Sequence, residues 1–169
     1  TLSRHDALPI YITTRQQVQL RQLKIENVPE VFDLLEEAGL TSTQTGMDNV
    51  RNIIGCPVAG LNPKERVNAY AQVKALTEHI LNNSEFSNLP RKFNVAISGC
   101  AADCVHAETQ DLALVPAVQE KGGNHVYGFN ILVGGKLGSG GYRIATSLDV
   151  FLPPRSEERR VGKEGRPRW

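Results

Sequence analysis

The sequence has few cysteines, no long apolar run and little excess charge, and each shortage excludes a class of protein. Three cysteines in 169 residues are too few, and odd in number, for a disulfide framework, so we expect a reducing, cytoplasmic setting. No apolar run approaches the roughly 18 residues of a membrane-spanning helix, and no signal peptide is recognisable at the start. The net charge of +1 gives no reason to expect a nucleic-acid partner. The remaining composition, 40% hydrophobic and 22% charged, is typical of a globular chain.

The two ends of the sequence differ in composition from the rest. Residues 154–169 carry six basic and three acidic side chains but almost no apolar ones, so they cannot bury enough surface to become ordered. A nucleic-acid-binding arm is the functional alternative for this tail. We expect residues 1–9 and 154–169 to be non-native or disordered, and residues 10–153 to be a folded piece of a longer protein.

Local patterns predict both helices and strands between residues 10 and 153. One helix is expected from Asn27 to the left-handed residue Gly39. A second is expected to begin with Asn62 as its N-cap and Glu65 as its third residue, and to stop near residues 82–83. The expected strands are residues 10–14, 18–25, 93–98, 111–116 and 126–133. Glycine-rich loops are expected after the last strand, and this order favours an α+β fold.

Permanent cations occur in three short polar loops next to predicted strands. Arg15 lies in the turn between the first two strands, Arg51 lies in the loop 45–57, and Arg91 and Lys92 precede the strand at 93–98. Binding groups are often carried by loops on a rigid scaffold, and converging cations would suit a polyanionic ligand. The alternative for each residue taken alone is a surface position with a weak ion pair.

Cys100, Cys104 and His106 form the other candidate group. Two thiols and an imidazole resemble part of a zinc or iron–sulfur ligand set. However, a C-x3-C pair is a weak pattern, no second pair follows it, and Cys56 is isolated. The alternative is a turn of small residues after a strand.

Four motifs together carry a resemblance to a known family. The segments ITTRQ, DNVRNIIG, LPRKFN and GFNILVGG resemble assimilatory ferredoxin-dependent nitrite reductases and, less closely, the sulfite reductase hemoproteins of the same superfamily. The resemblance covers about residues 10–152. It implies part of a ferredoxin-like nitrite/sulfite reductase half-domain at 10–55, followed by the first siroheme-binding αβ lobe at 56–153.

The same resemblance implies a reaction, its cofactors and its partners. Family members reduce nitrite to ammonia with six electrons from ferredoxin, using siroheme coupled to a [4Fe–4S] cluster. The implied cofactor contacts are Arg15, Arg51, Arg91 and His106. The implied catalytic residues are Arg51, Lys92 and Asn94. Arg15 would pair with siroheme carboxylates, Arg51 would face the macrocycle and nitrite, and Lys92 would bind substrate and deliver protons.

Asn94 and the cysteines distinguish the alternatives within this resemblance. Asn94 would line the distal pocket, where sulfite reductases carry a lysine, so its neutral side chain favours monoanionic nitrite over sulfite. Family cluster ligands lie in the C-terminal half, which this chain lacks, so Cys100 and Cys104 are not expected to be ligands and Cys56 is expected to be structural. A hypothesis from another class is an autonomous anion- or metal-binding module that uses the same cations with Cys100, Cys104 and His106.

Overall fold

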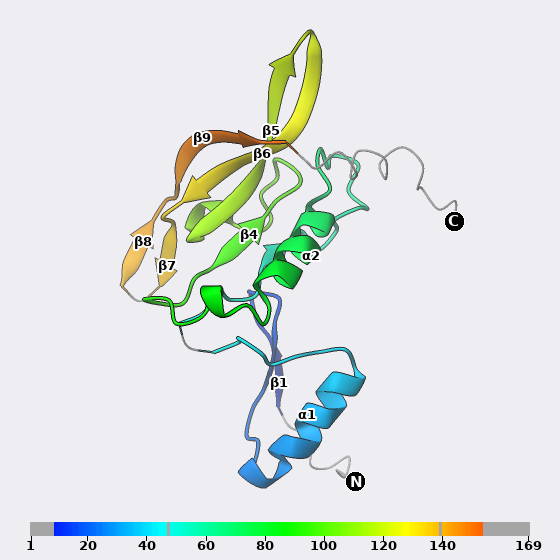
Figure 1. Ribbon diagram of the computed structural model, residues 1–169, viewed down its shortest axis with the longest axis vertical. Coiled ribbons are helices and arrows are strands. Elements are labelled where there is room, and N and C mark those ends of the chain that lie inside the picture. The colour runs from blue at the N-terminus through cyan, green and yellow to red at the C-terminus, as the bar shows by residue number, and fades with distance from the viewer. Residues whose placement is uncertain (1–8, 47, 139, 154–169) are drawn as a thin grey trace, which may run out of the picture.

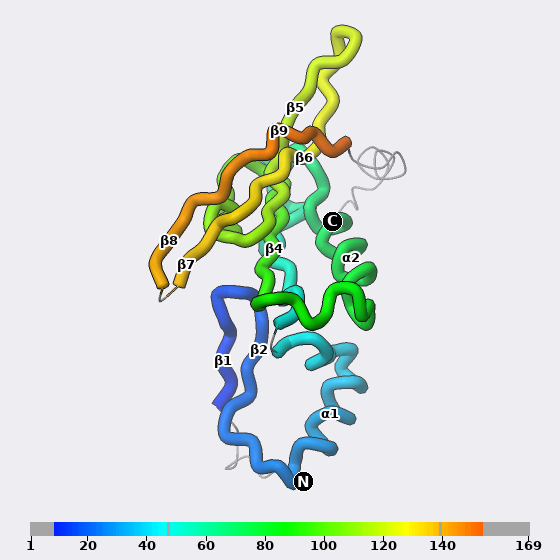
Figure 2. The backbone as a smooth tube through the Cα atoms, turned by 60° about the vertical axis from the view of Figure 1, so that its left-hand side comes forward, coloured from blue at the N-terminus to red at the C-terminus, as the bar shows by residue number. Residues whose placement is uncertain are grey.

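The computed structural model describes residues 9–46, 48–138 and 140–153. A unit of one β-hairpin and one helix lies at one end of the molecule, and a larger unit built on a mixed sheet lies at the other (Figures 1 and 2). The α+β prediction is therefore confirmed. In these ranges, no helix is both long enough and apolar enough to cross a membrane.

The smaller unit follows its sequence pattern except that the strand predicted at 18–25 ends at Leu20 and a 3₁₀ turn begins at Ile25. Strands β1 (Ile10–Ile12) and β2 (Val18–Leu20) pair antiparallel around the predicted turn, and helix α1 (Val28–Glu37) follows a single 3₁₀ turn. Gly39 ends this helix with a φ of +69°, the left-handed conformation that glycine adopts without steric cost. Asn27 occupies the N-cap position, but its side chain forms no capping hydrogen bond because the preceding 3₁₀ turn holds its backbone in a helical conformation.

The larger unit contains a five-stranded sheet in the order β3-β4-β5-β6-β9. The first three strands are parallel, and β6 and β9 are antiparallel to their neighbours. These strands are β3 (Ile54–Gly55), β4 (Val95–Ile97), β5 (Leu112–Lys121), β6 (Asn124–Val133) and β9 (Thr146–Leu152). Since β3 pairs with β4, the sheet crosses the expected domain boundary between residues 55 and 56.

Both faces of the sheet are covered at β4, which places the core there. Val95 and Ile97 point to one face and pack with the residues of helix α2 (Ala69–Ile80), while Ala96 points to the other face. The second face is covered by the connection that leads from β4 to β5, including the buried Val105. Parallel strands require such a crossover connection, and this one determines where β5 begins.

The predicted strands at 93–98, 111–116 and 126–133 are present, but the last two are longer than predicted. β5 and β6 are each ten residues long and form a hairpin that projects beyond the rest of the sheet (Figure 1). Its two-residue turn is Gly122-Gly123, both with positive φ, which matches the right-handed twist of the strands. Strands β7 (Lys136–Gly138), β8 (Gly141–Arg143) and β9 occupy the region where only glycine-rich loops were expected.

The predicted start of the second helix is wrong by one and a half turns. Helix α2 begins at Ala69, and Asn68 is its N-cap, accepting a hydrogen bond from the Ala71 amide at 3.2 Å. The Glu65 carboxylate, expected in a capping box, accepts instead from the amides of Gly60 and Ala69. The amides of residues 66 and 67 donate to the carbonyl of residue 99, which holds this segment against the end of β4 and out of the helix.

Candidate functional site

The predicted cationic loops converge on one edge of the sheet. Arg51 comes just before β3, Lys92 and Asn94 come just before β4, and Asp111 comes just before β5. Because these three strands are parallel, the residues that precede them lie along the same edge. The backbone joins these loops, since the Arg51 amide donates to the Phe93 carbonyl at 2.8 Å.

Arg15 connects the hairpin of the smaller unit to this edge. Its Nη1 donates to Gln110 Oε1 at 2.9 Å and its Nη2 donates to the Asn52 carbonyl at 2.8 Å. Asn52 returns a hydrogen bond from its side-chain amide to the Arg15 carbonyl at 2.8 Å. Gln16 adds a similar reciprocal pair with the backbone of Gly55. The turn that was predicted to present a cation is therefore attached by both its side chains and its backbone to the start of β3.

The charge of Arg15 lies in a partly buried and partly cationic environment. Burial lowers the pKa of its guanidinium below the usual value, the Asp111 carboxylate raises that pKa, and the Arg51 guanidinium lowers it again. An arginine nevertheless stays protonated at neutral pH. The two arginines thus lie within electrostatic reach of each other, with Asp111 as a compensating charge. The Arg15 Nε atom is buried and has no acceptor among the residues that the structure describes.

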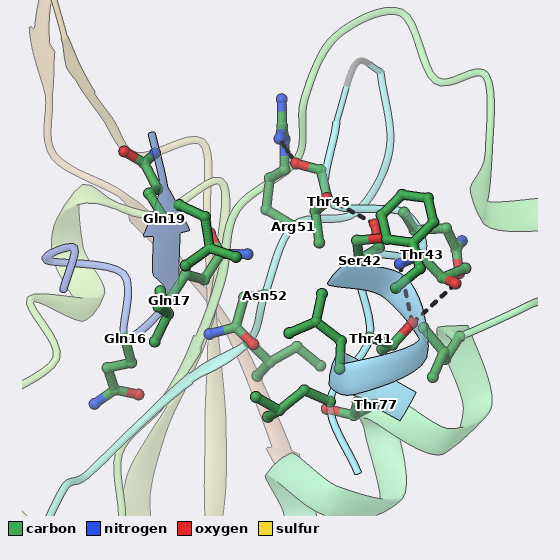
Figure 3. Close-up of a pocket in the computed structure, with 18 of the residues that line it drawn as sticks. Gln16, Gln17, Gln19, Thr41, Ser42, Thr43, Thr45, Arg51, Asn52 and Thr77 are labelled. Atoms are coloured by element: carbon green, nitrogen blue, oxygen red, sulfur yellow. Dashed lines mark hydrogen bonds between the residues drawn. The ribbon is translucent and has the colours of Figure 1, made fainter. Parts of the chain in front are cut away.

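Arg51 lies beside a cavity of about 590 Å³ between the two units (Figure 3). Its guanidinium donates to the carbonyl of the neighbouring Thr45, which belongs to a hydroxyl-rich segment that also lines the cavity. Asn52 lines the same cavity, as do Thr41, Ser42 and Thr43. The cavity therefore adjoins the Arg15–Asn52 contact and offers both a cation and several hydroxyl groups to an occupant.

Arg91 and Lys92 have exposed side chains, whereas Asn94 is half-buried. In the described ranges, the structure shows no hydrogen bond or salt bridge for the side chains of Arg91 and Lys92. The Asn94 backbone is fixed on both sides, because its amide donates to Asp111 Oδ2 at 2.8 Å and its carbonyl accepts from the Leu112 amide. The loop is thus anchored at Asn94, while its two cations extend into solvent.

The cysteine group does not assemble with these cations. Cys100 is buried after the opposite, carboxyl end of β4, and Asn62 donates a hydrogen bond to its sulfur at 3.4 Å. Cys104 and His106 are exposed in the β4–β5 connection. Among the described residues, no three His, Cys, Asp or Glu side chains are grouped closely enough to hold a metal. The His106 carbonyl accepts from the Gln110 side chain at 3.3 Å, which connects this residue to the cationic edge.

The donor set can be compared with the two cofactors that the motifs imply. The guanidinium groups of Arg15 and Arg51 suit the carboxylates of siroheme, and the buried Arg15 Nε has no acceptor among the described residues. A [4Fe–4S] cluster needs four thiolates, and the described part of the chain contains three dispersed cysteines. The residues present therefore fit siroheme carboxylates but do not fit a cluster.

The sequence patterns missed three residues that hold this edge together: Asn52, Gln110 and Asp111. A signal for Asp111 exists, because it is an acidic residue at the start of a predicted strand. Once the strands are known to be parallel, that position lies beside the starts of the other two. Gln110 offers no comparable signal, since only the fold brings it to within hydrogen-bond distance of Arg15.

Comparison with known proteins agrees with the motifs. Residues 46–161 match the nitrite and sulphite reductase 4Fe-4S domain, and residues 2–38 match the nitrite/sulfite reductase ferredoxin-like half domain. The chain is 48% identical over 148 residues to a ferredoxin–nitrite reductase of Leptolyngbya laminosa, covering 85% of this chain and 28% of that protein. It is 46% identical over 152 residues to the ferredoxin–nitrite reductase of Synechococcus elongatus, covering 88% and 29%.

A solved structure supports the same relationship. The Mycobacterium tuberculosis NirA protein matches with a TM-score of 0.76 and 28% identity, covering 85% of this chain and 25% of that one. The chain therefore spans little more than a quarter of the length of these relatives. The expected resemblance is confirmed: the chain belongs to the nitrite and sulphite reductase family.

Proposed function

We propose that this chain is part of a ferredoxin-dependent nitrite reductase and supplies the cationic side of its siroheme and nitrite site. The observation that carries the proposal is the convergence of the Arg15, Arg51 and Lys92 loops at the amino edge of three parallel strands. The names of the relatives support nitrite as substrate and ferredoxin as electron donor. We assign residues 10–55 to the ferredoxin-like half-domain and residues 56–153 to the siroheme-binding domain.

The reaction dictates what the side chains must provide. Converting nitrite to ammonium takes up six electrons and eight protons and releases two molecules of water. A partly buried anion needs cations beside it, and Arg51 supplies one next to the cavity. Lys92, exposed at the same edge, is suited to bind nitrite and to donate protons as the oxygens leave. Arg91 supports this loop, and the neutral Asn94 favours nitrite over the dianion sulfite.

The cofactor would be held mainly by the two partly buried arginines. Arg15 retains N–H groups beyond those that donate to Gln110 and Asn52, and these would bind siroheme carboxylates together with Arg51. When bound, siroheme supplies a redox-active iron centre, to which the iron–sulfur cluster of the family delivers electrons. His106 is assigned to the rim of this site. The cluster ligands are assigned to the part of the enzyme beyond this chain.

Lys92→Ala in the full-length reductase tests the proposed catalytic role. Removing a proton donor from the site should lower nitrite turnover by about 100-fold or more, because general acid catalysis contributes at least that much. Siroheme content per chain should stay unchanged, since Lys92 is not among the cofactor contacts. Lys64→Ala, at another exposed lysine, is the matched control and should leave turnover unaffected. Unchanged turnover in Lys92→Ala would remove Lys92 from the mechanism.

The sulfite reductase alternative is tested by substrate preference in the same enzyme. A higher kcat/KM for sulfite than for nitrite would favour the hemoprotein class and would refute the argument from Asn94. The hypothesis of an autonomous anion- or metal-binding module is less well supported. Cys100 lies at the opposite edge from the cations, and no group of metal-binding side chains is found in the described ranges.

A further inference from the structure

Asp111 has a position that the proposed mechanism does not yet use. It stands directly between Gln110, which accepts from Arg15, and Leu112, whose amide donates to the Asn94 carbonyl. Its own Oδ2 accepts from the Asn94 amide at 2.8 Å, in a half-buried setting. The Asp111 carboxylate therefore lies between Arg15, which joins the two units, and the loop that carries Lys92.

The hydrogen bond from Asn94 is one that the sheet cannot provide. Pairing between β4 and β5 begins with Val95 opposite Leu112, so the amide of Asn94 lies just outside the ladder. A half-buried amide without an acceptor is costly, and a carboxylate is a stronger acceptor than a neutral group. Asp111 thus anchors the backbone at Asn94, where the loop 89–94 joins the start of β4.

The charge of Asp111 is matched to its surroundings. Arg51 lies close enough to disfavour the charge on Arg15, and Asp111 favours that charge. A neutral acceptor would satisfy the Asn94 amide but would leave this repulsion uncompensated. The main chain of Asp111 is held separately, because its carbonyl accepts from the Gly134 amide at 2.9 Å. A change of side chain should therefore leave the start of β5 in place.

Resting on the proposed function, we propose that Asp111 is a positioning residue of this site. Its carboxylate holds Asn94, and with it the loop carrying Lys92, at a fixed place beside Arg15. Asp111 itself does not touch substrate in this account. It acts through the backbone of Asn94. A variant at position 111 should therefore lower kcat only if its side chain no longer accepts the hydrogen bond from the Asn94 amide.

The test uses three variants of the full-length reductase loaded with its cofactors. Asp111→Ala removes the acceptor, and Asp111→Asn keeps an oxygen that can accept from the Asn94 amide. Glu108→Gln, at an exposed carboxylate in the same connection, is the matched control. The readouts are siroheme content, kcat for nitrite, and hydrogen exchange of the peptide that covers residues 91–97.

In Asp111→Ala, we expect exchange in residues 91–97 to accelerate and kcat to fall, each by about tenfold, as for a lost hydrogen bond to a charged group. Siroheme content should match that of the unchanged enzyme. Asp111→Asn should restore the protection and most of kcat, and the control should behave like the unchanged enzyme.

Three results would overturn the inference. The first is hydrogen exchange of residues 91–97 in Asp111→Ala at the same rate as in the unchanged enzyme. The second is an Asp111→Asn variant as impaired as Asp111→Ala. The third is a loss of siroheme in proportion to kcat, which indicates a purely structural role. If the unchanged enzyme reduces no nitrite, the proposed function fails instead, and the exchange data alone decide whether Asp111 holds Asn94.

Discussion

Arg15 is the residue through which the two units of the molecule are most directly joined. Its guanidinium donates to the Gln110 side chain and to the Asn52 carbonyl. The Asn52 side chain in turn donates to the Arg15 carbonyl. The planar guanidinium holds its donors in a rigid fork, so its two terminal nitrogens reach two acceptors that are fixed in different directions. The residue thus has a structural role alongside its proposed role toward siroheme carboxylates.

Arg15→Lys tests the structural role without removing the charge. Lysine cannot donate to Gln110 and Asn52 in the same geometry, so the free energy of unfolding should fall by about 2 kcal/mol. Arg21→Lys is the control, because Arg21 is exposed and its guanidinium lies over the ring of Tyr11. Urea unfolding followed by circular dichroism measures both variants. Equal, small losses in the two would show that the Arg15 hydrogen bonds contribute little.

At the scale of secondary-structure elements, the connection between β6 and β7 packs directly against the residues next to Asp111. A Cβ atom on Gly135 would approach the carbonyl oxygens of Glu108 and Gln110 more closely than van der Waals contact allows. Backbone atoms cannot swing aside as a flexible side chain can, so the site edge and this connection are coupled. Glycine is required here by close approach, since its φ is ordinary.

Gly135→Ala should therefore destabilise the protein by about 1–3 kcal/mol, as overpacking does in a tight interior. Because the displaced backbone includes Gln110, siroheme content of the full enzyme should also fall. Gly138→Ala is a matched control, with open space around its added methyl group and no positive φ. Thermal unfolding and cofactor content measure both effects. If the two variants have the same stability and siroheme content, the backbone around Gly135 can move to accept a methyl group.

Elements specified by local patterns were predicted well, and those that depend on long-range contacts were not. The β1–β2 hairpin, α1 and its end at Gly39 follow from spacing and from a glycine with a defined conformation. The start of α2 was misplaced because Glu65 accepts from amides on both sides of it and the carbonyl of residue 99 captures the next two amides. No local pattern reveals that carbonyl.

In the candidate site too, local patterns identify some residues, and others become apparent only from long-range contacts. Arg15, Arg51 and Lys92 were found from their residue types and loop positions, but their convergence depends on β3, β4 and β5 being parallel. Gln110 and Asp111 were missed for the same reason. That Cys100 is not a cluster ligand stays a prediction from the family motifs, and the structure places this residue after the end of β4 opposite to the cations.

At the scale of the whole molecule, the β7–β8 hairpin and the residue that follows it expose large apolar side chains. Leu137 and Tyr142 are cross-strand partners in this hairpin and are exposed to 73% and 82%. Ile144 follows at 63%. Contiguous apolar surface of this kind promotes association in water. The chain prepared by itself should therefore self-associate.

Sedimentation velocity over a range of concentrations tests this expectation. The unchanged chain should show a sedimentation coefficient that rises with concentration, and the double variant Leu137→Ser/Tyr142→Ser should reduce that rise. Leu61→Ser, at an exposed leucine in a separate turn, is the control and should leave association unchanged. A chain that remains monomeric at every concentration would show that this surface does not drive association.

We propose that these cations serve a siroheme enzyme that reduces nitrite. The most direct measurement is ammonium formation by the full-length protein with reduced ferredoxin, with nitrite and sulfite compared as substrates. The account predicts one ammonium for every six electrons consumed and a higher kcat/KM for nitrite than for sulfite. A protein that reduces sulfite more efficiently, or that turns over neither anion although siroheme is bound, would contradict it.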